Sequence, residues 1–181
     1  MPDVQQTISD FYRVATERDF ARDFQFRVLS IDSGGASSQT FDEDDLVYCT
    51  AGSLPSREIT NVAVPYMGLN FNLPGNATYP ESGNYSLQFY CDQNSLIRQK
   101  FEDMSRDIFD DATSTGNYFT PRASASINLV QLDTQLDEVA SYKLVGASVR
   151  NVGAIEYQIS SGTGAQVTFG ATMAYHYFQR N

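Results

Sequence analysis

The sequence contains few of the residues that build catalytic and metal sites. Its 181 residues include no tryptophan, two cysteines and one histidine, His176. Zinc therefore has little support, because neither CxxC nor HxH spacing occurs. The sequence also contains no GxSxG elbow, no Walker loop and no dinucleotide-binding glycine motif. We expect no enzyme, no catalytic residues, no metal site and no cofactor. A carboxylate pair among the 22 acids stays open as the one catalytic alternative.

Basic residues and long apolar runs are also scarce. Twelve Lys and Arg against 22 Asp and Glu give a formal net charge of −10. This argues against nucleic-acid binding, since phosphate contacts need a basic patch, but it suits a protein that DNA passes without being held. No apolar run reaches the length of a transmembrane helix, and residues 1–10 lack the pattern of a signal peptide. We therefore expect no membrane anchor and assembly in the cytosol, where Cys49 and Cys91 would be reduced core thiols; a disulfide is the alternative.

One stretch has a strong helical pattern, at about 94–112. Its apolar residues recur at spacings of three and four, which places them on one helical face that we expect to face a core: Ile97, Phe101, Met104 and Ile108. Asp92, Asn94 or Ser95 is expected to cap the start. A lone helix of this length is marginal in water, so it needs a sheet to lie on.

The rest of the chain is typical of strands and turns. We expect strands at 24–31, 46–50, 57–64, 69–73, 84–91, 123–132, 142–149, 154–160 and 166–178. The acidic run 41–45 and the segment 135–141 are expected to be a solvated loop and a turn; calcium at 41–45 lacks the EF-hand order of ligands. We predict a single domain, 1–181, with an N-terminal arm at 1–23 that holds a short helix, and a projecting hairpin loop at 55–75.

Short motifs in a shared order carry a resemblance to a known family. They are Asp19-Phe-Ala-Arg22, Leu54-Pro55, Val64-Pro-Tyr-Met67, Arg98-Gln-Lys-Phe101, Asn151-Val-Gly153 and Tyr175-His-Tyr177. Over residues 19–178 this order resembles the tail tube protein of T-even-type contractile-tailed bacteriophages. The tryptophans of the family pattern are missing, and extra residues stand around 32–45 and 74–84. Both the main tube subunit and a baseplate protein that initiates the tube therefore remain open.

The resemblance implies a mainly β (α+β) fold, an antiparallel β-sandwich or barrel with one flanking α-helix. It implies hexameric rings in which the sheets of neighbours join into a continuous inner β-barrel. The rings stack into a hollow tube inside a contractile sheath, through which DNA passes without specific binding. The implied partners are further copies of the chain, a sheath protein, a baseplate tube initiator and a tail terminator. The implied location is the virion tail, assembled in the host cytoplasm.

Two sets of candidate residues accompany this interpretation. We assign contacts between subunits or rings to Arg22, Arg57, Val64, Tyr66, Met67, Leu69, Phe71 and His176. The acids expected to face the lumen, where six copies multiply the net charge sixfold, are Glu43, Asp44, Asp133, Asp137 and Glu156. Three other functions remain as alternatives: the inner tube of another contractile injection system, a β-sandwich carbohydrate-binding module that uses the 11 Tyr and 12 Phe, and a hydrolase.

Overall fold

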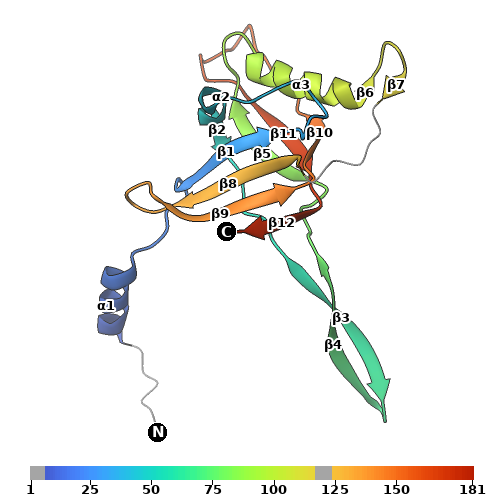
Figure 1. The fold of residues 1–181 in the computed structure, drawn as a ribbon. Coiled ribbons are helices and arrows are strands. Elements are labelled where there is room, and N and C mark those ends of the chain that lie inside the picture. Colours follow the sequence, from blue (N-terminus) through green and yellow to red (C-terminus); the bar gives the residue numbers. More distant parts are fainter. Residues whose placement is uncertain (1–6, 117–123) are drawn as a thin grey trace.

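The computed structural model describes residues 7–116 and 124–181. These residues form two four-stranded antiparallel sheets that enclose one core, with a helix across their upper end (Figure 1). The first sheet has the order β1 (Phe26–Asp32), β8 (Ser126–Leu132), β9 (Glu138–Val145), β12 (Tyr177–Arg180). The second has the order β10 (Ser148–Val152), β11 (Thr168–Ala174), β5 (Tyr85–Tyr90), β2 (Cys49–Ala51). The expected antiparallel sandwich is therefore confirmed.

Strict alternation positions the second sheet over the core. Along β5 the side chains of Tyr85, Leu87 and Phe89 are buried, and the residues between them are exposed. Strand β11 alternates in the same way, with Phe169 and Met173 facing inward. The register pairs Phe89 with Phe169, and their rings stack with centroids 5.8 Å apart. The strand predicted at 84–91 is confirmed.

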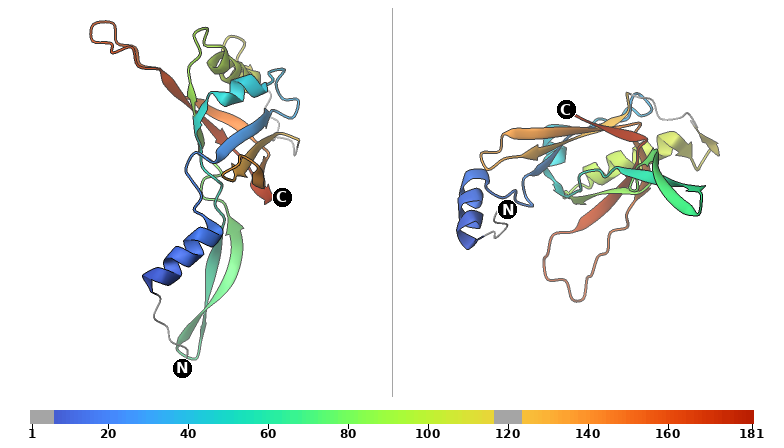
Figure 2. Two further views of the ribbon diagram at one scale, coloured as in Figure 1. Left: turned by 90° about the vertical axis from the view of Figure 1, so that its left-hand side faces the viewer. Right: turned by 90° about the horizontal axis from the view of Figure 1, so that it is seen from below.

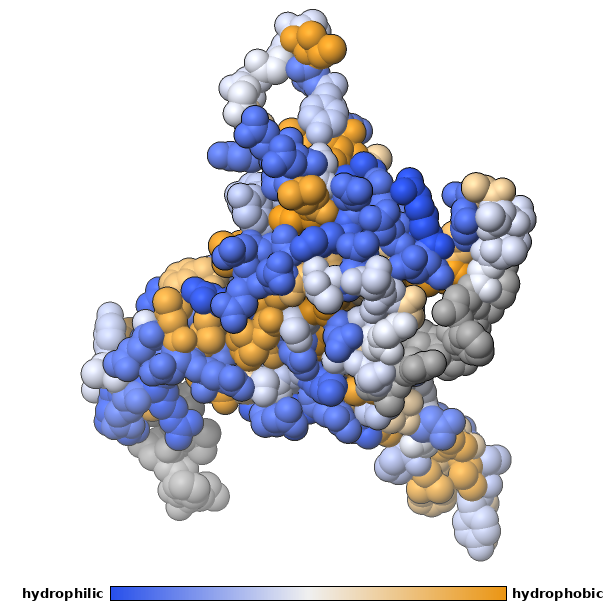
Figure 3. All heavy atoms as spheres, turned by 45° about the horizontal axis from the view of Figure 1, so that its top comes forward, coloured by the Kyte–Doolittle hydropathy of each residue, from blue (hydrophilic) through white to orange (hydrophobic). Residues whose placement is uncertain are grey.

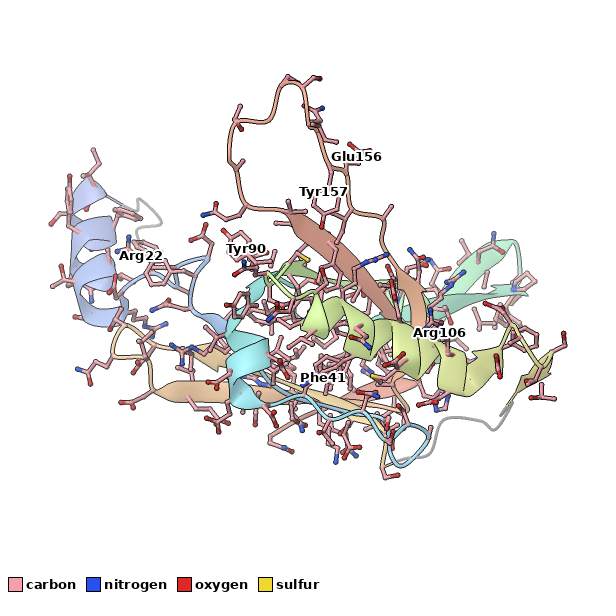
Figure 4. All side chains as sticks on the ribbon, turned by 90° about the horizontal axis from the view of Figure 1, so that it is seen from above. Arg22, Phe41, Tyr90, Arg106, Glu156 and Tyr157 are labelled. Atoms are coloured by element: carbon pink, nitrogen blue, oxygen red, sulfur yellow. The ribbon has the colours of Figure 1, made fainter. Side chains whose placement is uncertain are left out.

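Helix α3 (Leu96–Ile108) lies between the two sheets at their upper end (Figure 4). Ile97, Phe101 and Met104 are buried as predicted, whereas Ile108 is partly exposed. The ring of Phe101 lies 5.3 Å from that of Phe89 and 4.6 Å from that of Phe41, centroid to centroid. The start is capped by Asp92, one of the three expected residues. Its carboxylate accepts hydrogen bonds from the first free backbone N–H groups of the helix, at 3.0 and 3.3 Å.

The prediction of a loop at 41–45 is wrong, because a short helix, α2 (Glu43–Val47), forms there. The strand predicted at 46–50 consequently begins later, as β2 at Cys49. The Asp45 carboxylate explains why the helix forms. Its Oδ2 accepts the backbone N–H of Asp42 at 3.0 Å and lies 2.5 Å from Nζ of Lys100 on α3. Leu46, the buried residue of α2, anchors this helix in the core. The acidic run thus ties α2 to α3, although it also exposes Glu43 and Asp44.

Two strands that we predicted as continuous are interrupted where the chain passes between the sheets. The segment 142–149 divides into β9 and β10 at Gly146, and 166–178 divides into β11 and β12 at His176. The two crossings touch, since a Cβ on Gly146 would lie 2.4 Å from Nδ1 of His176. Gly146 also has φ +74°, which favours glycine. Each strand therefore contributes its halves to different sheets.

Three smaller predictions also need correction. Strand β1 contains a bulge between Val28 and Ser30, so Val28 and Ile31 are buried together although simple alternation puts them on opposite faces. Residues 154–160 alternate in sequence but form a loop between β10 and β11, because they pair with no neighbouring strand. The predicted turn at 135–141 is shorter than expected, since β9 begins at Glu138. Residues 117–123, which include the first residue of the strand predicted at 123–132, lie outside the described residues. Before them, β6 (Phe109–Asp110) pairs with β7 (Thr115–Gly116).

Candidate assembly interface

Three segments project from the sandwich with apolar side chains in solvent. They are helix α1 (Ile8–Arg18), the hairpin of β3 (Glu58–Tyr66) and β4 (Leu69–Thr78), and the loop 153–167 (Figures 1 and 2). Helix α1 lies within the arm predicted at 1–23, of which residues 1–6 lie outside the described residues. The hairpin lies where a projecting hairpin was predicted, at 55–75, although β4 continues past Pro74 to Thr78. Apolar side chains in solvent favour burial against another molecule.

The hairpin has one apolar face and one polar face. Its register pairs Val62 with Leu73, Val64 with Phe71 and Tyr66 with Leu69. Because cross-strand partners share a face and successive pairs alternate, these six side chains form one continuous apolar face. Between them, Ala63 pairs with Asn72 and Pro65 with Asn70, on the opposite face. We call the first set the hairpin apolar face; it comprises Val62, Val64, Tyr66, Leu69, Phe71 and Leu73.

Nothing in residues 7–116 and 124–181 covers the hairpin apolar face. Its six side chains are 41% to 65% exposed. No residue from Ile59 to Pro80 carries a charge, in a chain with 34 charged residues among Lys, Arg, Asp and Glu. Figure 3 shows the resulting apolar surface along the hairpin, at lower right. A solvated ribbon normally carries charges that discourage pairing, so a neutral one is typical of a contact surface.

The backbone of the hairpin is built to stay extended. Met67 (φ 49°) and Gly68 (φ 80°) form a two-residue turn with both φ values positive, which matches the right-handed twist of the strands. That turn makes Tyr66 and Leu69 a hydrogen-bonded pair. Alternation then places Pro65 and Pro74 at positions without ladder bonds, so neither proline removes a hydrogen bond. Asn would fit the turn better than Met67, which is 85% exposed at the tip. The methionine is therefore easier to explain as a contact residue.

Helix α1 has a second uncovered apolar face. Ile8, Phe11, Tyr12 and Ala15 follow the spacing i, i+3, i+4, i+7, and no residue of the helix is buried. Asp10, Arg13 and Glu17 lie on the other side, where Arg13 and Glu17 form an ion pair at 3.5 Å. The start is fixed by a capping box, in which Thr7 and Asp10 exchange hydrogen bonds. These hydrogen bonds, from the side chain and backbone of Thr7, hold the pKa of Asp10 below its ordinary value.

The third segment, the loop 153–167, rises beside α3 and bears Glu156 and Tyr157 (Figure 4). Tyr157 is mostly exposed and Ile159 is fully exposed. Gly162 and Gly164 lie near its tip, and Gly164 has φ +78°, a conformation that favours glycine. It offers a further apolar contact away from the hairpin.

The structure brings together most, but not all, of the residues that we assigned to contacts. Val64, Tyr66, Met67, Leu69 and Phe71 lie on the hairpin, and Arg57 directly precedes β3. Two others lie elsewhere. Arg22 follows α1, where its backbone N–H donates to Gln25 Oε1 at 2.6 Å. His176 lies at the crossing between β11 and β12.

The five acids assigned to the lumen occupy three separate places. Glu43 and Asp44 lie on α2, and Glu156 lies in the loop 153–167. Asp133 and Asp137 stand in the β8–β9 turn, where Oδ1 of Asp133 accepts the backbone N–H of Asp137 at 2.9 Å. None of the five is on a strand. Their orientation toward a lumen stays a prediction.

Sequence reasoning missed several residues of the apolar faces. Val62 and Leu73 belong to the hairpin apolar face but were not assigned, because their membership depends on the register. Val62 and Val64 are two residues apart, as are Leu69, Phe71 and Leu73, so the alternation was present in the sequence. The register that joins them required the turn at Met67-Gly68 to be located.

The described residues offer little for catalysis. Within residues 7–116 and 124–181, no three His, Cys, Asp or Glu side chains are placed to hold a metal ion. Cys49 and Cys91 are free, so the disulfide alternative is wrong. Burial raises the pKa of the Cys49 thiol to about 11, so it is a poor nucleophile at neutral pH. No helix in the described part of the chain is long and apolar enough to cross a membrane.

Comparisons with known proteins rest on structure. No protein-family model matches the sequence, and no curated protein matches it by sequence. A chain of the anti-feeding prophage (AFP) baseplate is similar with a TM-score of 0.60 and 14% identity over 90% of this chain and 95% of its own. A chain of the PVC sheath/tube terminator of an extracellular contractile injection system gives 0.61 and 10% over 90% and 96%. A chain of the PVC sheath-tube complex gives 0.56 and 9% over 98% and 99%.

These matches extend over nearly the whole of each chain, so the likeness concerns the complete fold and not one motif. At these identities it establishes the fold alone. The sandwich, the helix across its end and the projecting hairpin agree with the fold that the resemblance to tail tube proteins predicts. The chain has the fold of the tube-, baseplate- and terminator-associated proteins of contractile injection systems.

Proposed function

We propose that this chain is a structural subunit of a contractile tail or related injection machine. It forms hexameric rings that stack into a hollow tube inside a sheath. The observation that carries the proposal is the hairpin apolar face, an uncharged surface of six side chains that no described residue covers. The fold shared with components of such machines supports the same function.

The sheet edges support assembly from a second direction. Within the described residues each sheet ends in strands that pair on one side only, β1 and β12 in the first sheet and β10 and β2 in the second. Open edges are avoided in soluble monomers, because they present unpaired backbone groups to other chains. Neighbouring copies that pair edge to edge would satisfy these groups and give the continuous inner barrel that a tube needs.

The charge of the chain suits a conduit for DNA. A net charge of −10 per copy repels phosphate, so DNA would slide through the tube without being held. No catalytic step is required of such a subunit. In this function the chain contributes its shape, its strand edges and a net charge of the same sign as that of DNA.

A variant with a shortened hairpin tests the proposal. Replacing residues 63–72 with Asn-Gly leaves Val62 and Leu73 as the closing hydrogen-bonded pair of a favourable two-residue turn. We expect this variant to fold as the parent does but to stay monomeric in sedimentation velocity, while the parent forms rings or tubes. A control with Asn70→Ser and Asn72→Ser changes only the polar face and should assemble normally. A shortened variant that assembles like the parent would contradict the assigned role of the hairpin.

A second role within the same machine is favoured by one observation. Two of the similar structures are a baseplate and a sheath/tube terminator, positions at which a single ring starts or ends a tube. A tube subunit self-assembles into stacks of rings, whereas an initiator or terminator stops at one ring. The length distribution of the assembled particles separates these roles.

A further inference from the structure

We propose that the α1 apolar face (Ile8, Phe11, Tyr12 and Ala15) of one copy packs on the hairpin apolar face of the next copy in the same ring. This inference rests on the proposed function, because it requires a ring. The occupant of the hairpin apolar face is thus a defined segment of a second copy of this chain.

The positions of the two elements carry the inference. Helix α1 and the β3–β4 hairpin both extend below the sandwich, and seen from below they lie at opposite ends of the molecule (Figures 1 and 2). A chain with complementary surfaces on opposite flanks forms a head-to-tail contact with its neighbour. Head-to-tail contacts close into rings when the rotation between copies divides a full turn.

Both faces need a partner of the same kind. The hairpin is uncharged from Ile59 to Pro80, and the α1 apolar face carries no charge either. Asp10, Arg13 and Glu17 lie off that face, with Arg13 paired to Glu17 at 3.5 Å, and Arg18 stands at its border in the last turn. The ring of Phe20 stacks on Phe11 with centroids 5.9 Å apart and lengthens the apolar surface of the arm. An apolar helix on an apolar ribbon buries both without desolvating a charge.

The area is sufficient for a specific contact. An aromatic side chain carries about 150–250 Å² of surface. Two of the six hairpin side chains are aromatic and the four Val and Leu side chains are smaller, so at about half exposure the six present on the order of 400–500 Å². An equal area on α1 and Phe20 brings the total to about 1,000 Å², the lower limit for a specific interface. Repeated around a ring, this contact would act together with strand pairing at the sheet edges.

Cysteine pairs test the contact between copies. Ala15→Cys on α1 and Val64→Cys on the hairpin are placed in one chain, which is assembled, oxidised and run on a non-reducing gel. Each copy should link to its two neighbours, so we expect a ladder of disulfide-linked oligomers that ends at the number of subunits in the ring. The matched control, Arg13→Cys with Asn72→Cys, lies off both apolar faces and should give no ladder. Each single variant controls for Cys49 and Cys91.

The outcomes separate this inference from the proposed function. A ladder from the apolar pair and none from the control supports the contact. Rings or tubes visible in the same sample without a ladder would overturn the contact and leave the proposed function standing. A disulfide within one chain, detected as a faster-migrating monomer, would also overturn it, because α1 would then cover its own hairpin. A parent chain that forms no ring contradicts the proposed function and the inference with it.

Discussion

A single charge placed on either face of the hairpin distinguishes a contact surface from a solvated ribbon. Phe71→Asp and Asn72→Asp add the same charge at adjacent positions of β4, but on opposite faces. Phe71 is 49% exposed in the free chain. Burying a whole phenylalanine contributes about 1.5–3 kcal/mol, so covering the exposed half contributes about 0.7–1.5 kcal/mol per contact. Each 1.4 kcal/mol is about tenfold in an association constant.

We therefore expect Phe71→Asp to raise the concentration for half-assembly at least about tenfold, since desolvating the new carboxylate adds to the lost burial. The free energy of unfolding of the monomer should fall by no more than about 1.5 kcal/mol, because only the half of the ring that the chain itself covers is lost. Asn72→Asp should change neither quantity. Light scattering across a dilution series measures assembly, and urea unfolding followed by circular dichroism measures stability. Equal effects of the two variants on assembly would refute the idea that the apolar face makes the contact.

Three further outcomes follow from the core and its crossings. Phe101→Ala should lower the free energy of unfolding by about 3–5 kcal/mol, because it deletes a buried ring. Leu96→Ala, on the exposed side of α3, should change that free energy little. Similar unfolding midpoints for the two variants would show that α3 does not pack on the sheets. Gly146→Ala should destabilise more than Gly35→Ala, because both have positive φ, worth roughly 1–2 kcal/mol, but only Gly146 lies against another residue. Burial raises the pKa of the Cys49 thiol from 9.0 to about 11. In a Cys91→Ser variant, alkylation of Cys49 at pH 8 should therefore be on the order of 100-fold slower in the folded chain than in the urea-unfolded chain. Equal alkylation rates would contradict this burial.

The sequence supported the elements whose pattern is local. The stripe of Ile97, Phe101 and Met104 places α3 against the core, and the alternation of Tyr85, Leu87 and Phe89 defines β5. These patterns suffice because each side chain faces the same core along the whole element. The predicted helix was too long at both ends, since its ends depend on the cap at Asp92 and on the β6–β7 pair that follows.

The predictions failed where the structure of a segment depends on residues that are distant in the sequence. Alternation continues from Phe169 through Tyr175, so the pattern gives no sign that the chain then leaves one sheet for the other at His176. Residues 154–160 alternate equally well but pair with no strand. Helix α2 has one buried apolar residue, Leu46, and its Asp45 pairs with a lysine 55 positions away. The cap between Asp42 and Asp45 is local and was readable in the sequence, whereas the lysine partner was not.

The candidate interface divides in the same way. The lack of charge from Ile59 to Pro80 is readable in the sequence, although our predictions did not use it. The register that gathers the six side chains on one face was not readable there, because it depends on the two-residue turn at Met67. The position of α1 on the flank opposite the hairpin could not be predicted either, because it depends on how the whole chain folds (Figure 2).

Negative-stain electron microscopy of the purified protein, across a series of protein and salt concentrations, shows whether this chain assembles into a tube. We expect rings with six-fold symmetry and a central hole, single or stacked into hollow tubes, which are lost when residues 63–72 are replaced with Asn-Gly. Particles that stay monomeric at every concentration, even after purified baseplates are added as a template, would contradict the proposed function.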